Sequence, residues 1–236
     1  MKMKNYILIL IMILSFVLPA EIKQSDIPEI KYETLDINGN KNYMVTKPVF
    51  IDNVKFKNIN DKINKLIDKE TLEREEKEFC VEDPGRCSSF QVIIEPAIDY
   101  YDKDVISLSI NIYQYTGGAH GGSYTESFII DRKTGKDITD NILGEAKDKV
   151  LGKIYNYILK NPQEIFFSGD MIDKNCVIKD CPIFLKEEKD SVQIRYGQYA
   201  VASYAASEQV FEYNFKTKKL YFYDPTTSNE EKIEIK

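Results

Sequence analysis

The segment from Asp104 to Tyr115 constrains the fold more than any other part of the chain. Its side chains alternate in character, with Ile106, Leu108, Ile110 and Ile112 on one side and Ser107, Ser109, Asn111 and Tyr113 on the other. A period of two residues is typical of a β-strand, whose successive side chains point to opposite faces of a sheet. The pattern therefore predicts a long strand with one face in a hydrophobic core.

The flanking residues place this strand in an antiparallel sheet. Gln91 to Tyr101 reads as the preceding strand, and Asp102-Lys103-Asp104 reads as the turn between the two. A glycine-rich loop, residues 116–122, leads into a returning strand over Tyr124 to Asp131. A tight turn follows, with Gly135 at the position that favours a left-handed backbone.

The remaining pattern mixes strands and helices. Strands are expected at 30–37 and 43–50, and at 183–185, 192–196, 209–215 and 220–223, with a frayed tail after Asp224. One helix is expected from about Ile59 through Glu78, with Asn58 or Asn60 as its cap, and another from Thr139 or Asp140 to Asn161. The predicted class is α+β: antiparallel sheets with two main helices packed on them, in two intertwined or adjacent subdomains.

The N-terminus is typical of an export signal. Lys2 and Lys4 precede an apolar run from Tyr6 to Leu18, and Ala20 suits the last position before cleavage. The run is shorter than the about 20 residues of a membrane-spanning helix. We expect a signal peptide at residues 1–20 and a periplasmic, secreted or outer-surface location, the alternative being an uncleaved N-terminal anchor.

The number and spacing of the four cysteines are consistent with export. Cys80 and Cys87 form one local pair in the sequence, and Cys176 and Cys181 form another. In an oxidising compartment we predict Cys80–Cys87 and Cys176–Cys181 disulfides. The alternative is a four-cysteine zinc site, but the six residues between Cys80 and Cys87 exceed the usual ligand spacing.

The charge excludes one class of partner. The formal charge is −6, and it becomes −8 when the two lysines of residues 1–20 are removed. An acidic chain is a poor ligand for nucleic acid. It suits a basic protein partner, or it serves only to keep the protein soluble.

No set of residues predicts catalysis. His120, in the glycine-rich loop, is the single histidine. A general base needs an orienting carboxylate and a nucleophile, and zinc needs further ligands; no spacing here supplies either. The alternative is a structural role in which the imidazole hydrogen-bonds the loop backbone. We predict no catalytic residue, metal or cofactor.

The segment from Tyr196 to Ser207 (YGQYAVASYAAS) combines tyrosines with small residues. Small residues permit close packing, and the tyrosines then belong to the core. Exposed tyrosines such as Tyr199 and Tyr204 would instead suit contact with a protein. Together with His120 they are the candidate binding residues.

The order of these motifs resembles a known family. The matching segments are Tyr113 and Tyr115 to Gly121, Asp131 with Thr134 to Lys136, and Tyr199 to Ala206. They resemble the extracytoplasmic part of RsiV-type anti-sigma factors and the N-terminal part of PdaC-type peptidoglycan deacetylases. The resemblance implies a PdaC-type accessory domain at 21–118 and an RsiV-type domain at 119–236. Ser203 and Ser207 depart from the proline and glycine of the family pattern.

The resemblance implies binding more than catalysis. PdaC-type deacetylation depends on a separate metal-binding domain with several histidines, so we do not expect that activity here. Sigma-factor control needs a cytoplasmic segment, and only five residues precede Tyr6. The corresponding region of RsiV binds lysozyme. We therefore expect an exported, non-catalytic binding protein whose partner is lysozyme or a peptidoglycan component; the alternatives are a carboxylate-dependent envelope hydrolase and a structural envelope protein.

Overall fold

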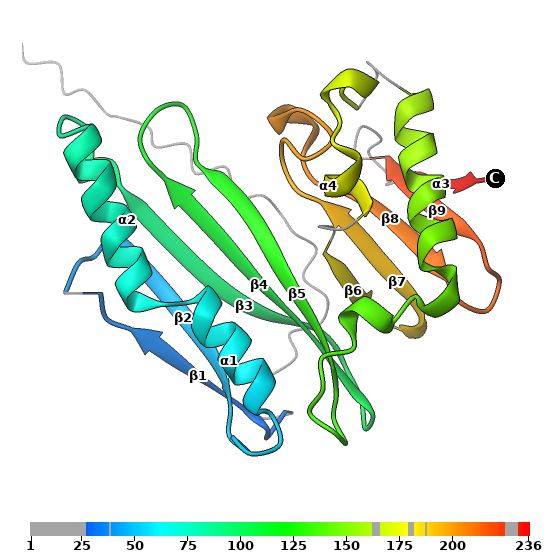
Figure 1. Cartoon of the computed structure of the whole chain (residues 1–236), viewed down its shortest axis with the longest axis horizontal. Helices are drawn as coiled ribbons and strands as arrows, with labels where there is room; N and C mark the ends of the chain where they lie inside the picture. The colour runs from blue at the N-terminus through cyan, green and yellow to red at the C-terminus, as the bar shows by residue number, and fades with distance from the viewer. Residues whose placement is uncertain (1–26, 38, 162–165, 179–181, 187, 225–230) are drawn as a thin grey trace, which may run out of the picture.

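The protein folds into two units, each built on a five-stranded sheet with its own hydrophobic core. The computed structural model describes residues 27–37, 39–161, 166–178, 182–186, 188–224 and 231–236. The predicted signal peptide, residues 1–20, lies outside these residues. Figure 1 shows the two units side by side, with helices on one face of each sheet. The predicted α+β class is confirmed. Among the described residues, no helix has the length and apolar character needed to cross a bilayer.

The first unit, residues 27–131, contains the strands that the alternating pattern predicted. Its sheet has the order β1-β2-β3-β4-β5. The strands are β1 (Ile30–Leu35), β2 (Tyr43–Phe50), β3 (Gln91–Tyr101), β4 (Val105–Tyr115) and β5 (Gly122–Asp131). Neighbours are antiparallel except β2 and β3, which are parallel. Parallel neighbours need a crossover connection, and two helices between them provide it.

The helical part of the first unit differs from the prediction of one continuous helix. It consists of α1 (Lys57–Leu66) and α2 (Lys69–Glu82). The break lies at Asp68, whose carboxylate accepts a hydrogen bond from the Thr71 backbone N–H at 2.9 Å and so caps α2. A capping aspartate satisfies a donor that the first turn leaves unpaired, which favours a new helix start at this point.

Asn60 does not cap α1 as expected, because α1 has no side-chain cap. Its side chain is buried and pairs with the backbone of Phe50. The amide accepts from the Phe50 N–H at 2.9 Å and donates to the Phe50 C=O at 2.9 Å. These two bonds attach α1 to the end of β2.

The second unit, residues 137–236, is an antiparallel meander. Its sheet has the order β10-β9-β8-β7-β6. The strands are β6 (Ile183–Lys186), β7 (Glu188–Tyr196), β8 (Gln209–Asn214), β9 (Leu220–Asp224) and β10 (Glu231–Ile235). The expectation of a frayed tail is wrong for β10, which pairs with β9 and buries Ile235.

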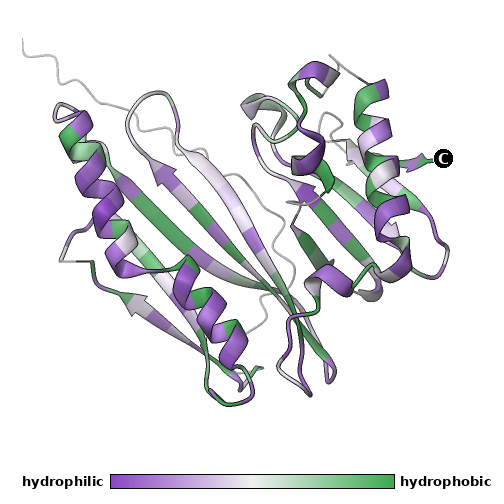
Figure 2. Ribbon diagram, in the orientation of Figure 1, coloured by the Kyte–Doolittle hydropathy of each residue, from purple (hydrophilic) through white to green (hydrophobic). Residues whose placement is uncertain are grey.

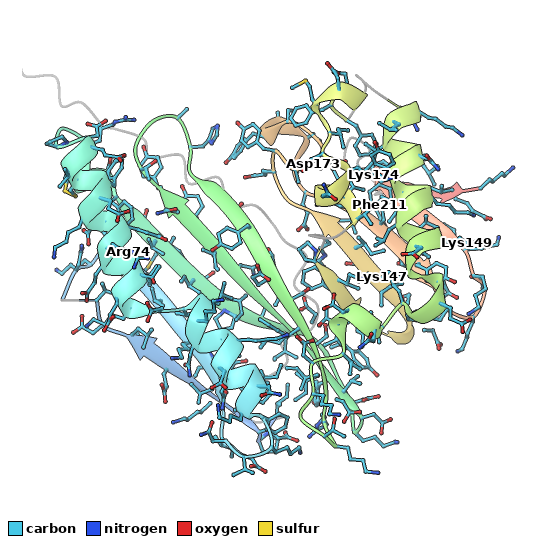
Figure 3. The ribbon with its side chains drawn as sticks, in the orientation of Figure 1. Arg74, Lys147, Lys149, Asp173, Lys174 and Phe211 are labelled. Atoms are coloured by element: carbon cyan, nitrogen blue, oxygen red, sulfur yellow. A yellow bond between two sulfur atoms is a disulfide. The ribbon has the colours of Figure 1, made fainter. Side chains whose placement is uncertain are left out.

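Helices cover one face of this second sheet. They are α3 (Lys147–Lys160) and the short α4 (Lys174–Ile178). The expected start near Thr139 is occupied by two 3₁₀ turns, and Gly144, with φ of 52°, interrupts the α-helical path before α3 begins. Phe211 on β8, labelled in Figure 3, packs against α3: the centroid of its ring is 6.1 Å from that of Tyr157 on α3. Figure 2 shows hydrophobic residues concentrated on the strands, whereas the visible sides of α1 and α2 are mostly hydrophilic.

Two serines, one on β4 and one on β5, join the two units. The Ser107 and Ser127 hydroxyls accept hydrogen bonds from the backbone N–H groups of Leu185 and Ile183, at 3.1 and 3.0 Å. Edge strand β6 therefore meets the face of the first sheet. The domain boundary predicted between residues 118 and 119 falls in the β4–β5 turn, and the first sheet continues to Asp131 because β5 pairs with β4 along its length.

The disulfide prediction is confirmed for one pair. Cys80, in the last turn of α2, is bonded to Cys87, so the loop between them is closed. The predicted Cys176–Cys181 pair lies outside the described residues, because Cys181 and the side chain of Cys176 are not described.

Candidate functional site

The glycine-rich loop between β4 and β5 carries His120 at its end. Gly117 and Gly118 have φ of 86° and 105°, conformations that other residues rarely adopt. At Gly121 a Cβ atom would lie 2.5 Å from the Tyr113 ring and from the Gln114 carbonyl oxygen. The loop can therefore fold back on β4 only with glycine at these positions, and this turn positions His120 close to the start of β5.

The imidazole of His120 is held on both nitrogens. Nδ1 lies 3.0 Å from the Gly121 carbonyl oxygen, and Nε2 lies 3.2 Å from the Tyr199 hydroxyl. A carbonyl oxygen only accepts, so the neutral ring carries its proton on Nδ1 and Nε2 accepts from Tyr199. The expected hydrogen bond to the loop backbone is thus present, together with a second bond to the other unit.

The ring of His120 also stacks on Tyr204. Their centroids are 3.9 Å apart with an angle of 15° between the planes. Tyr199 lies 6.0 Å from both rings. We call these three side chains the aromatic cluster.

In the second unit, Tyr199 lies on a turn that backbone hydrogen bonds hold in place, and Tyr204 follows shortly after it. Tyr199 has φ of 65°, and its N–H donates to the Ala202 C=O at 3.1 Å. Val201 and Ala202 are buried, and the Val201 carbonyl accepts from the Phe167 N–H at 2.9 Å. With these neighbours turned inward, Tyr199 points outward and is 55% exposed.

A further hydrogen bond joins the two units next to the aromatic cluster. The Ser123 hydroxyl, at the start of β5, donates to the Gln198 side-chain oxygen at 3.3 Å. The serine contacts to β6, and the aromatic cluster with its Ser123–Gln198 bond, are therefore two of the contacts that join the first and second units.

The structure brings the three candidate binding residues together. His120 and the two tyrosines are separated by about 80 positions in sequence, yet their rings form one surface feature. The segment 196–207 combines both predicted roles, because Tyr196 is buried while Tyr199 is exposed. Tyr196 donates its hydroxyl proton to the Val177 carbonyl at 2.8 Å, as a core tyrosine does.

Among the described residues, the carboxyl groups whose pKa departs from its ordinary value all have a lowered pKa. Burial alone would raise the pKa of Glu29, but the hydrogen bond and charge of Arg132 outweigh it and lower the pKa. Hydrogen bonds from Thr134 lower the pKa of Asp131 in the same way. A general acid at neutral pH needs the opposite shift. No group of three or more metal-ligating side chains occurs among the described residues.

Sequence reasoning missed a groove beside β5. It is a cavity of about 540 Å³ between α1, the edge of β5 and the segment before β6. Two lysines of α1 line it together with polar residues of β5 and carboxylates on either side: Lys62, Lys65, Thr125, Glu126, Ser127, Asp137 and Asp140. These residues carry no motif, and their sequence positions do not show which strand lies at the edge of the sheet.

One family model matches the N-terminal part of the chain. Residues 21–123 match the family model described as Deacetylase PdaC. A search of curated protein sequences finds no match.

Two solved structures of DUF3298 family proteins are similar to this chain. The first, from Bacteroides fragilis, is 16% identical, with 80% of this chain and 91% of that chain aligned and a TM-score of 0.46. The second, from Pseudomonas aeruginosa, is 14% identical, with 77% and 86% aligned and a TM-score of 0.44.

Proposed function

We propose that this chain, which carries a PdaC-type domain over residues 21–123, is an exported, non-catalytic binding protein of the cell envelope. Its partner is lysozyme or a peptidoglycan component, and the aromatic cluster is its contact surface. The observation that carries the proposal is the meeting of His120, Tyr199 and Tyr204 across the two units.

The cluster has the features of a binding hot spot. Tyrosine provides a large contact area at low cost in side-chain entropy, and hot spots are rich in it. Here Tyr199 is exposed while its hydroxyl is held by His120. The ring of Tyr204 is held by stacking. Side chains already ordered in the free protein lose less entropy on binding.

The charge of the chain suits a basic partner. Its formal charge is −6, and lysozyme, the partner implied by the resemblance to RsiV, is basic. Opposite charges raise the rate at which two proteins associate. A peptidoglycan fragment would instead depend mainly on ring stacking and hydrogen bonding, so binding in high salt distinguishes the two partners.

The decisive measurement is calorimetric titration with lysozyme and, separately, with soluble peptidoglycan fragments. We expect one of them to bind, and the Tyr199→Ala and Tyr204→Ala proteins to bind it about tenfold or more weakly. Tyr124→Ala is the matched control, since Tyr124 is 53% exposed and outside the cluster. Absence of binding to both ligands, or equal losses in all three variants, would contradict the proposal.

A further inference from the structure

The loop closed by the Cys80–Cys87 disulfide lies against the glycine-rich loop between β4 and β5. A Cβ atom added to Gly117 would lie 2.9 Å from the Cδ atom of Arg86 and 2.9 Å from the hydroxyl oxygen of Ser89. These two side chains therefore fill the space beside the glycine. Figure 1 shows the end of α2 and the turn between β4 and β5 at the same end of the first unit.

Arg86 is held in this position from within its own loop. Its guanidinium donates to the Asp83 carboxylate at 2.6 Å, and its backbone carbonyl accepts from the Ser89 hydroxyl at 2.6 Å. The disulfide closes the loop at the residue that follows Arg86. It thereby restrains the backbone from which this arginine reaches Gly117.

Few other contacts hold the disulfide loop. No side chain of residues 81–86 is buried, and Val81 is 79% exposed. The two cysteines themselves are half-buried. A segment with few buried contacts opens at a low cost in free energy. The covalent bond is therefore the main restraint on this loop, and it lies close enough to the surface for a small thiol to approach.

The glycine-rich loop connects this contact to the aromatic cluster. Gly117 has φ of 86° and lies three residues before His120. Glycine can adopt many backbone conformations, so its conformation here depends on the side chains that pack on it. His120 accepts a hydrogen bond from Tyr199 and stacks on Tyr204. A movement at Gly117 would displace the backbone that positions the imidazole.

We propose that the Cys80–Cys87 disulfide is a reducible switch that keeps the aromatic cluster ordered, and that a dithiol reductant is the co-reactant that releases it. A thiolate of the dithiol attacks one cysteine sulfur, the S–S bond breaks, and the other cysteine sulfur leaves as a thiolate that takes up a proton. The second thiol of the reductant, as its thiolate, then attacks the mixed disulfide. It frees the first cysteine and forms the reductant's own disulfide, so the electron pair and the two protons that the protein gains are those that the dithiol loses.

Reduction lets Arg86 move away from Gly117, and the aromatic cluster loses part of its support. Side chains that are not ordered in the free protein lose more entropy when a partner binds. The effect on binding rests on the proposed function, whereas the effect on the order of the cluster does not. The two effects are measured separately.

The first test uses the full chain, without a histidine tag, carrying Cys176→Ser and Cys181→Ser so that dithiothreitol can reduce only the pair at 80 and 87. His120 is the single histidine, so the carbon-bound protons of its ring give identifiable NMR signals. The ring of Tyr204 shifts these signals because it stacks on the imidazole. On reduction we expect them to move toward their positions in the urea-unfolded chain. Unchanged signals after complete reduction overturn the proposal.

The turn between β3 and β4 reports whether reduction loosens the whole first unit instead. The backbone N–H groups of Asp104 and Val105 donate to the Asp102 carboxylate in this turn. Their NMR signals should stay in place on reduction. A change there as large as that of the imidazole would mean general destabilisation, and would also overturn the switch.

Arg86→Ala tests the same contact with the disulfide intact. Removing the side chain that packs on Gly117 should move the imidazole signals in the same direction as reduction does. Arg74→Ala is the matched control, since Arg74, labelled in Figure 3, is an exposed arginine of α2 that pairs with Glu78 at 3.9 Å. Equal shifts in the two variants would overturn the role given to Arg86.

Binding is compared between the parent chain and Cys80→Ser/Cys87→Ser, because a reductant would also attack a protein ligand. In calorimetric titrations with lysozyme and with the peptidoglycan fragments, we expect the variant to bind about fivefold or more weakly. Equal affinities for a ligand that binds would overturn the control of binding by the disulfide. If neither ligand binds either protein, the proposed function fails, and the imidazole signals alone decide for or against the switch.

Discussion

The hydroxyl of Ser107, inside β4, accepts a hydrogen bond from the backbone N–H of Leu185, 78 positions later in the chain, at 3.1 Å. Ser107 is fully buried. An edge strand has backbone N–H groups that need acceptors when they are removed from water. A serine on the face of the first sheet thus provides the acceptor for a backbone N–H on the edge strand of the second sheet. This contact helps to fix how the two units meet.

Replacing Ser107 with alanine should therefore destabilise the protein. The change leaves the Leu185 N–H without its acceptor in a buried position, which costs about 1–3 kcal/mol. The free energy of unfolding from urea titration measures it. Ser109→Ala is the control, because the Ser109 hydroxyl makes only a long 3.4 Å bond to the carbonyl of exposed Ala97. Equal losses in the two variants would contradict the role given to Ser107.

Asn60→Ala should have a larger effect. It removes the partner of both the N–H and the C=O of Phe50 in the buried contact between α1 and β2. Two unsatisfied backbone groups are expected to cost about 2–4 kcal/mol. Asn58→Ala on the exposed side of the same helix should change the free energy of unfolding by less than about 0.5 kcal/mol. Thermal and urea unfolding of both variants test the difference.

The Glu29–Arg132 pair should make stability depend on pH. Their side chains lie 2.5 Å apart, and the pKa of Glu29 is lowered in the folded state. A lowered pKa stabilises the fold above the unfolded value of 4.5, and this contribution is lost as the pH falls through the folded pKa. Glu29→Gln should show a smaller loss of stability between pH 5 and 3 than the wild type, as measured by urea titration across about that range. An unchanged pH dependence would remove this pair as a source of acid sensitivity.

The stack of His120 on Tyr204 should be separable from the hydrogen bonds of the imidazole. His120→Phe keeps an aromatic ring but loses the bonds to Gly121 and Tyr199, whereas His120→Ala loses all three contacts. We expect His120→Ala to cost about 0.5–1.5 kcal/mol more than His120→Phe. The rate of hydrogen exchange of the loop amides should likewise be higher in His120→Ala than in His120→Phe. Identical exchange in both variants would show that stacking does not order the loop.

Removing the Cys80–Cys87 disulfide should lower the free energy of unfolding by about 2.5 kcal/mol. The reason is that a loop closed over seven positions reduces the conformational entropy of the unfolded chain. The double variant Cys80→Ser/Cys87→Ser tests this by urea unfolding under non-reducing conditions. Peptide mapping of the unreduced wild type tests the predicted Cys176–Cys181 bond as well. Free thiols at residues 176 and 181 would show that prediction to be wrong.

Local features could be read from the sequence because they depend on neighbouring residues. The alternation in β4, the turn at Asp102 and the left-handed Gly135 need only backbone geometry and side-chain direction. Errors arose where a single contact overrode a periodic pattern. Asp68 divides one expected helix into two, and the pairing of β10 with β9 orders residues in the expected frayed tail.

The sequence by itself determined most of the strands, the α+β class, the Cys80–Cys87 disulfide and the three candidate binding residues His120, Tyr199 and Tyr204. Only the tertiary structure decided that the serine face of β4 is buried and that His120 stacks on Tyr204. Alternation shows that two side chains point to opposite faces, but it does not show what covers each face. That depends on contacts between residues far apart in the chain, which form only when the two sheets pack together.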